Sequence, residues 1–312
     1  MKGAFCTLLF LFLAGVASGG LEKYPGFVVS GGETARGTSR GGIRITYLGV
    51  NGYQFETAGH ALLADPYFSR VGLGAAIFDQ SITPSPERIE EGFKHLQARA
   101  DAILVTHAHF DHLLDVPELL RRTGARLCSG PTAVALAQSL GTPPRRCVTV
   151  QPGSVKRIGP WTIRVFAAQH DRLFGSVPFP GKARAPVKAP VKPSDWVTGE
   201  PLAFVIEAAG KRIYLDAGGL PGAPPDPAVG KVDLAILGVA LSDSRQRFPA
   251  TVRPLHPRYV LASHQDDFFQ PFSHGFVFGK LTNFPEVVRT HENERLPGRL
   301  ILMDYFQPWT LR

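Results

Sequence analysis

One short stretch decides the fold of this chain: Thr106-His107-Ala108-His109-Phe110-Asp111-His112. It follows Ala102-Ile103-Leu104-Val105, an apolar run with β-branched residues that is typical of a buried strand. Residues two apart in a strand point the same way, so His107 and His109 can direct two imidazoles at one point. Asp111 and His112 are adjacent, so the backbone must turn there to present a second cluster. Because burying four such side chains costs much free energy, the pattern predicts a metal site rather than a loop of hydrogen-bonded histidines.

The motif His-x-His-x-Asp-His resembles the signature of the metallo-β-lactamase superfamily of hydrolases. The resemblance extends over about residues 43–312. It is strongest at this motif and rests on order and context further along the chain. It implies an αββα sandwich, in which two mixed sheets lie face to face with helices outside. The alternation of predicted strands and helices indicates by itself only an α/β fold.

Three later residues follow predicted strands as the first motif does. They are His170 after a strand at 162–168, Asp216 after one at 212–215, and His264 after one at 256–263. Taken alone, each has an ordinary explanation, a surface histidine or an aspartate that caps a turn. The resemblance implies two metal ions, the first bound by His107, His109 and His170, the second by Asp111, His112 and His264, with Asp216 shared. Asp111 would also orient the nucleophile, which makes it the candidate catalytic residue.

The opening strands point to a supporting residue. Strands are predicted at 43–48, 53–56 and 61–64, and the third ends at Asp65-Pro66. This arrangement resembles the branch of the superfamily that includes ascorbate-6-phosphate lactonase and N-acylphosphatidylethanolamine phospholipase D. The resemblance implies that the carboxylate of Asp65 accepts a hydrogen bond from a metal ligand. Capping of the turn before Pro66 is the alternative.

The ligand set determines the chemistry that we expect. Imidazole and carboxylate ligands suit zinc, and mixed sites of this kind also accept manganese or iron. Two ions about 3.5 to 4 Å apart can share a hydroxide, because metal binding lowers the pKa of water from about 15.7 to near 7. Such a hydroxide attacks an acyl carbon or a phosphorus atom, so no serine or cysteine nucleophile is required.

Three functions are compatible with this site. The first is an exported binuclear metal-dependent hydrolase acting on a lactone or a phosphodiester, including a phospholipid headgroup. Antibiotic cleavage is disfavoured, because the zinc β-lactamases of the superfamily lack an acidic bridging ligand at the place of Asp216. The second is a di-iron oxidoreductase on the same scaffold, although the sequence shows no flavin domain to deliver electrons. The third is a non-catalytic metal-binding or ligand-binding protein.

The first residues predict export. Lys2 precedes an apolar run from Ala4 to Ala17, and small residues follow at 16–19. This is the pattern of a signal peptide over residues 1–18, and the run is too short for a comfortable membrane span, although an uncleaved anchor is the alternative. Residues 19–42, rich in Gly, Ser and Thr, are predicted to be loosely ordered, and residues 43–312 to form the hydrolase domain. The protein would then be periplasmic or secreted.

The net charge of the chain limits the classes of partner that we expect. The formal net charge is +8, yet no nucleic-acid motif or aromatic-interleaved basic patch accompanies it. Anionic small molecules, lipid headgroups or an anionic membrane surface are therefore better partners. The segment 172–194 contains five basic residues, no acidic residue and a Pro-rich run, which predicts an extended loop. Because it follows His170 directly, we expect it to rim the substrate pocket, through Lys188 and Lys192 among others; a plain spacer is the alternative.

Cys128 and Cys147 lie on either side of a predicted helix at 132–140, each in or beside a predicted strand. Such strands are often neighbours, so an exported protein could join the two in a disulfide. Two free thiols are the equal alternative. Further helices are predicted from Ser85, an N-cap serine before proline, and from Asp115, whose sequence resembles a capping box.

Overall fold

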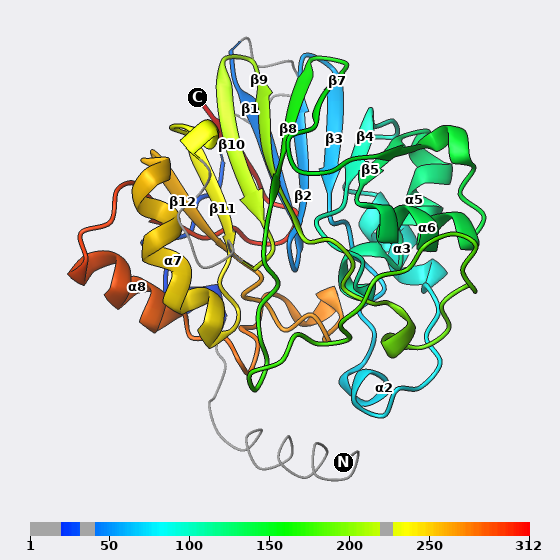
Figure 1. Cartoon of the computed structure of the whole chain (residues 1–312). Coiled ribbons are helices and arrows are strands. Elements are labelled where there is room, and N and C mark those ends of the chain that lie inside the picture. The colour runs from blue at the N-terminus through cyan, green and yellow to red at the C-terminus, as the bar shows by residue number, and fades with distance from the viewer. Residues whose placement is uncertain (1–19, 32–40, 219–226) are drawn as a thin grey trace.

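The computed structural model describes residues 20–31, 41–218 and 227–312. Two seven-stranded sheets lie face to face, and helices cover their outer sides (Figure 1). The predicted α/β sandwich with two mixed sheets is therefore confirmed. Among the helices that the structure describes, none has the length and apolar character that crossing a membrane requires.

The first sheet combines an antiparallel half and a parallel half. Its strands, in spatial order, are β14 (Pro308–Leu311), β1 (Ile43–Gly49), β2 (Gly52–Thr57), β3 (His60–Ala64), β4 (Ala102–Leu104), β5 (Arg126–Ser129) and β6 (Cys147–Thr149). Pairing is antiparallel from β14 to β3 and parallel from β3 to β6. The last strand of the chain thus closes the edge beside the first strand of the domain.

The second sheet is built in the same way. Its order is β13 (Arg299–Ile301), β12 (Tyr259–Ser263), β11 (Leu234–Gly238), β10 (Lys211–Asp216), β9 (Leu202–Ala208), β8 (Trp161–Ala167) and β7 (Val155–Ile158). Pairing is parallel from β13 to β10 and antiparallel from β10 to β7. The carboxyl ends of parallel strands lie at one edge of each sheet, and there the chain leaves β4, β10 and β12 with its polar motifs.

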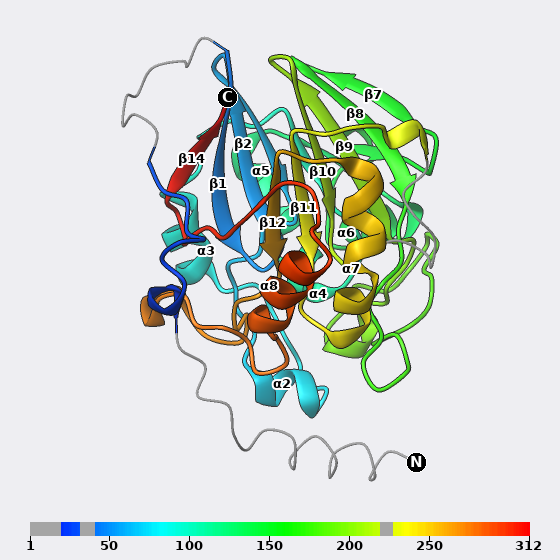
Figure 2. The same cartoon turned by 90° about the vertical axis from the view of Figure 1, so that its left-hand side faces the viewer.

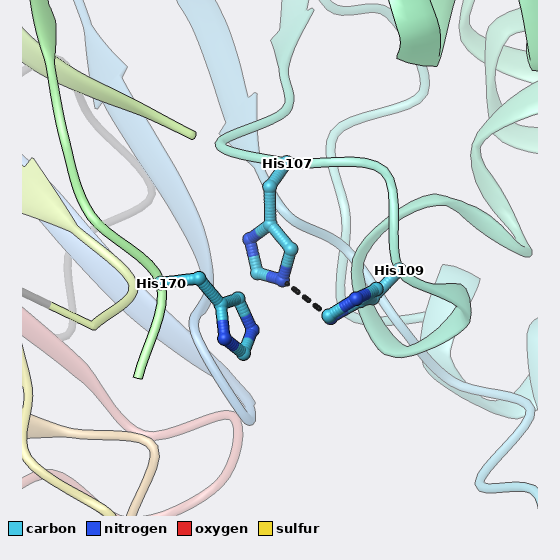
Figure 3. A group of neighbouring side chains, drawn as sticks. All are labelled: His107, His109 and His170. Atoms are coloured by element: carbon cyan, nitrogen blue, oxygen red, sulfur yellow. Dashed lines mark hydrogen bonds between the residues drawn. The ribbon is translucent and has the colours of Figure 1, made fainter. Parts of the chain in front are cut away.

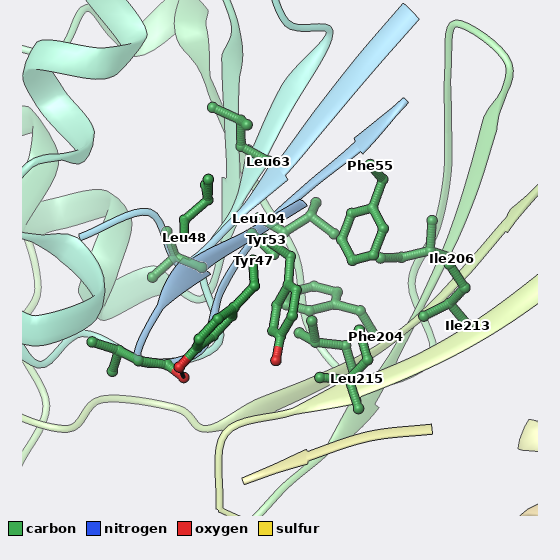
Figure 4. Packing of buried hydrophobic residues seen from close by; sticks show 14 of the residues in the cluster. Tyr47, Leu48, Tyr53, Phe55, Leu63, Leu104, Phe204, Ile206, Ile213 and Leu215 are labelled. Carbon is green, nitrogen blue, oxygen red and sulfur yellow. Dashed lines mark hydrogen bonds between the residues drawn. The ribbon is translucent and has the colours of Figure 1, made fainter. Parts of the chain in front are cut away.

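The core fills the space between the sheets. Figure 4 shows Tyr53, Phe55 and Leu104 of the first sheet opposite Phe204 and Ile213 of the second. Strand β8 shows why the chain folds this way, because its buried residues alternate with half-buried ones, as the two-residue period of a strand requires. Burial of these apolar side chains is the main force that holds the sheets together.

Helices cover both outer faces. The α-helices of the described residues are α2 (Leu73–Ile77), α3 (Pro86–Phe93), α4 (Phe110–Leu113), α5 (Val116–Thr123), α6 (Pro131–Ser139), α7 (Ser242–Leu255) and α8 (Phe284–Asn293), and the longer ones cover these faces. Figures 1 and 2 show α3, α5 and α6 outside the first sheet and α7 and α8 outside the second. The predicted cap of α3 is confirmed, since Ser85 Oγ accepts a hydrogen bond from the Arg88 backbone at 3.4 Å. Asp115 does not cap α5; its carboxylate accepts from the backbone N–H groups of Phe68 and Ser69 instead.

Part of the segment predicted to be loose is packed. In residues 20–31, Val29 donates a backbone hydrogen bond of 2.9 Å to Leu302, and Leu302 donates one of 2.8 Å to Phe27. The rings of Tyr24 and Phe27 lie 4.9 and 5.4 Å from that of Phe284 in α8, in edge-to-face geometry. The prediction was wrong here because it weighed the Gly, Ser and Thr content above these aromatic residues. Residues 32–40 and the predicted signal peptide, 1–18, lie outside the described residues.

Cys128 and Cys147 are free thiols. The strands that carry them are neighbours, as expected, but Cys128 pairs with Val148 and Cys147 with Leu127. This offset of one residue turns the two side chains to opposite faces of the sheet. The disulfide alternative is therefore wrong for this structure.

Candidate metal centre

Three histidines converge at the edge of the sandwich (Figure 3). His107 and His109 lie in the turn between β4 and α4, and His170 lies just after β8. One nitrogen of each falls within 4.8 Å of one nitrogen of each of the others. The ring centroids are 4.7 Å apart for His107 and His109, and 4.6 and 4.5 Å from them to His170. The structure thus brings together the predicted ligands of the first metal.

The hydrogen bonds of His107 and His109 fix which nitrogen faces the other. His109 Nε2 lies 3.0 Å from the carbonyl oxygen of Pro178, which can only accept, so Nε2 carries the proton. Thr106 Oγ1 donates to Asp65 at 2.7 Å and therefore accepts from His107 Nδ1 at 3.1 Å. His107 Nε2 and His109 Nδ1 are then both unprotonated, yet they lie 3.1 Å apart. Two lone pairs at that separation repel unless a cation lies between them, so the site fits a metal ion.

His170 is prepared in the same way. Its Nδ1 donates to the carbonyl oxygen of Asp171 at 2.7 Å, which leaves Nε2 unprotonated and directed at the other two rings. Burial lowers the pKa of His109 to about 3 and that of His170 to about 4, and it lowers the pKa of His107 well below its ordinary value. All three imidazoles are therefore neutral at pH 7, which is the form that binds a metal.

A second group lies beside the first. Asp111 Oδ2 is 3.4 Å from His112 Nε2 and 3.4 Å from His264 Nε2. The three ligand atoms lie within 4.8 Å of one another, and the ring of His112 is 4.0 Å from that of His107. Burial alone would lower the pKa of His112, but Asp111 and Asp65 raise it to about 10. Burial would raise the pKa of Asp111, but His112 and His264 hold it well below its usual range.

Asp65 supports both groups. Its Oδ2 lies 3.0 Å from His112 Nδ1, which is the contact with a ligand that the sequence predicted. The same oxygen accepts from Thr106 Oγ1, the atom that holds His107. One buried carboxylate therefore orients a histidine of each group, directly in one case and through Thr106 in the other. Sequence reasoning missed Thr106, although it stands immediately before the motif.

Asp216 belongs to neither group of ligand atoms in the described part of the chain. It ends β10 and is fully buried, and the next residues, Ala217 and Gly218, line a small cavity with His107 and His170. The turn is held by Arg247 of α7, which donates to Gly218 O at 2.5 Å and to Asp171 Oδ1 at 3.1 Å. The role of Asp216 as a shared ligand of the two metals stays a prediction. Gly219 lies outside the described residues.

The loop 172–194 reaches the first group. Besides the contact of Pro178 with His109, the ring of Phe179 lies 6.1 Å from that of His109 and perpendicular to it. Thr198 Oγ1, just beyond the loop, lies 3.0 Å from His109 Nε2. Lys192, however, pairs with Asp79 at 2.7 Å, so its charge is already neutralised. The sequence predicted the position of the loop but not these contacts, which depend on tertiary structure.

Two adjacent ligand sets, three nitrogens in one and two nitrogens with a carboxylate in the other, are donors that zinc and similar divalent ions prefer. Set between two facing mixed sheets, they define a metal-binding α/β sandwich. Residues 60–262, well over half of the chain, match the family model described as the Beta-lactamase superfamily domain. The chain belongs to the metallo-β-lactamase superfamily. The narrower likeness to its lactonase and phospholipase branch stays a prediction.

Relatives in sequence carry the same general name. The chain is 28% identical over 179 residues to a UPF0173 metal-dependent hydrolase of Rubrobacter xylanophilus, covering 56% of this chain and 60% of that protein. It is 32% identical over 137 residues to the UPF0173 metal-dependent hydrolase H16_A2129 of Cupriavidus necator, covering 42% and 44%. The chain spans about half the length of the curated relatives that it matches.

Solved structures share the fold. Igni18, a metallo hydrolase from the archaeon Ignicoccus hospitalis, is 17% identical, with a TM-score of 0.57 over 87% of this chain and 99% of that one. An isothiocyanate hydrolase from Delia radicum gut bacteria is 15% identical, with a TM-score of 0.55 over 86% and 98%. At such identities the likeness extends to the fold alone.

Proposed function

We propose that the protein is an exported hydrolase that uses two divalent metal ions to cleave a lactone or a phosphodiester-type anionic substrate. Zinc is the metal that we propose first, with manganese or iron as alternatives. The observation that carries the proposal is the close pair of ligand groups, His107 with His109 and His170, and Asp111 with His112 and His264. The relatives named metal-dependent hydrolases support it. Bound ions would make water nucleophilic near neutral pH and polarise the bond to be cleaved.

The side chains of this chain provide the rest of the chemistry. Asp111, between two histidines, is the carboxylate that can accept a proton from the attacking water and orient it. Phe179 lies against His109, and the ring of Phe268 lies 5.4 Å from that of His264. Both phenylalanines are half-buried, one beside each group. They therefore offer apolar walls for the part of the substrate that does not react.

The experiment is a metal analysis followed by a hydrolysis screen. Full-length protein purified without chelator is analysed for zinc, manganese and iron, and is then tested on lactones, phosphodiesters, phospholipids and β-lactams. We expect two equivalents of zinc or manganese and turnover of a lactone or a phosphodiester. Iron with redox turnover would support the oxidoreductase instead, and a bound ligand without turnover would support a binding protein.

We expect the basic loop to favour anionic substrates. Arg184 and Lys188 are exposed, so replacing both by alanine should weaken binding of an anionic substrate by about threefold to tenfold, since an exposed charge contributes about 0.2 to 1 kcal/mol. A neutral substrate should be unaffected. The matched control is Arg126→Ala with Arg145→Ala, which removes two exposed charges near the starts of β5 and β6, at the opposite end of those strands from the site. Equal losses for both substrates would rule out this role.

Export is part of the same proposal. It rests on Lys2 and the apolar run that follows it in the sequence. When the full chain is produced in a bacterial host, the protein outside the cytoplasm should begin near residue 19 on N-terminal sequencing. An uncleaved chain retained in the membrane fraction would favour the anchor instead.

A further inference from the structure

The turn between β1 and β2 lies at the metal site, where the sequence shows only Gly49-Val50-Asn51-Gly52. Asn51 is fully buried, which is unusual for an asparagine in a tight turn. Its Nδ2 donates to Asp65 Oδ2 at 2.9 Å, and its Oδ1 accepts from Ser263 Oγ at 2.8 Å. The carboxylate of Asp65 can only accept, so the amide orientation of Asn51 is fixed by its partners.

These two contacts lead to the two histidines of the second ligand group. Asp65 Oδ2 lies 3.0 Å from His112 Nδ1, and Ser263 is the residue immediately before His264. Asn51 therefore stands in the middle of a buried chain of contacts, in which two hydrogen bonds join Asp65, Asn51 and Ser263 and the ion pair of Asp65 with His112 extends the chain to the second group. His112 lies in α4, which follows β4 of the first sheet, and His264 follows β12 of the second sheet. The chain of contacts therefore also bridges the two sheets.

The backbone of the same turn holds His264 independently. His264 N–H donates to Val50 O at 2.8 Å, and Val50 N–H donates to Asp266 Oδ1 at 2.9 Å. Both residues have positive φ, 58° for His264 and 57° for Val50, a conformation that costs free energy for such side chains and persists only where neighbours impose it. The two strained residues are thus bound to each other across the gap between the sheets.

We infer that Asn51 is a positioning residue, which sets the separation of His112 and His264 and so affects the affinity of the second ligand group for its metal ion more than that of the first. The inference rests on the proposed binuclear function. Asn51 reaches the first group only indirectly, through Asp65 and Thr106 to His107, whereas His109 is held by Pro178 and Thr198. Partners that orient ligands typically change metal affinity by about 10- to 100-fold when removed.

The test measures Zn²⁺ or Co²⁺ binding by calorimetry on the full chain in two single-group backgrounds. His170→Ala impairs the first group, and His264→Ala impairs the second. In the His170→Ala background, adding Asn51→Ala should lower the affinity for the remaining metal ion about 10- to 100-fold. In the His264→Ala background the loss should be clearly smaller, because Asn51 reaches the remaining group only through Asp65, Thr106 and His107. Asp101→Asn, which removes a negative charge at the part-buried contact with Trp161 far from the site, should change neither.

Three outcomes distinguish a failure of the positioning role of Asn51 from a failure of the proposed binuclear function. An equal loss in both backgrounds would mean that Asn51 only stabilises the fold, and an unchanged affinity in both would mean that it positions nothing; either overturns the inference. A wild-type protein that binds no more than one ion would overturn the proposed binuclear function itself. Thr198→Ala should show the reverse pattern, with a loss only where the first group is intact, since its hydroxyl contacts His109.

Discussion

Replacing Asp111 by asparagine is expected to lower kcat/KM for hydrolysis on the order of 10³-fold. Asp111 Oδ2 lies 3.4 Å from a nitrogen of His112 and 3.4 Å from one of His264, so the carboxylate is the negatively charged member of the second group. The substitution keeps the shape of the side chain but removes its negative charge and its capacity to accept a proton. The second group would bind its metal ion less tightly, and the attacking water would be less well oriented.

Two measurements check this result. Steady-state kinetics on the substrate found in the screen give the loss of activity, and metal analysis of the dialysed variant should show that one of two equivalents is lost. Asp101→Asn is the control, because it makes the same chemical change at the other end of the sandwich, where Asp101 accepts from Trp161 at 2.9 Å. An Asp111→Asn protein that kept its activity within about tenfold would remove Asp111 from the proposed mechanism.

Replacing Arg70 by methionine is expected to lower the free energy of unfolding by about 3 to 5 kcal/mol. The side chains of Arg70 and Asp266 are fully buried, and their ion pair is 2.7 Å long. Asp266 also accepts from the hydroxyl groups of Tyr47 and Tyr305. Removing the guanidinium leaves this buried carboxylate without a compensating charge. A side chain at Gly49 would overlap the guanidinium, so the neighbouring turn is built around Arg70.

Denaturant unfolding of the metal-free protein measures this effect. The matched control is Arg121→Met, which removes an ion pair between Glu118 and an arginine that is 72% exposed, so the midpoint of denaturation should hardly change. Removing both charges, with Arg70→Met and Asp266→Leu, should cost less than the sum of the single changes, because each single change leaves a buried charge uncompensated and the double change leaves none. A loss below about 1 kcal/mol for Arg70→Met would contradict the expectation.

Local sequence patterns predicted most of the fold. Strand β1, the Ser85 cap of α3 and the strand before His107 depend on neighbouring residues, and each lies within a residue or two of its predicted place. The elements that were missed depend on distant partners or break local rules. Strand β14 exists because it pairs with β1 across the whole chain, and α7 contains Pro249 and Pro254.

The site divides in the same way. A motif within six residues predicted His107, His109, Asp111 and His112, and the order of strands added His170 and His264, which the structure places in the same two groups. Asn51 and Arg247 could not be predicted, because nothing near them in sequence suggests chemistry. They acquire a role only when β12 and α7 arrive from the far end of the chain. Asp216 was predicted from the resemblance and lies at the right strand end, outside both groups.

The register of β5 and β6 also has a practical use. Cys147 is partly exposed at the start of β6, whereas Cys128 is buried; burial raises the pKa of both thiols, that of Cys128 to about 12. Of the cysteines in the described residues, Cys147 is therefore the one that a maleimide dye should label. The start of β6 faces away from the histidines, so a fluorophore there would leave the mouth of the centre clear and could follow substrate docking in a single-molecule experiment.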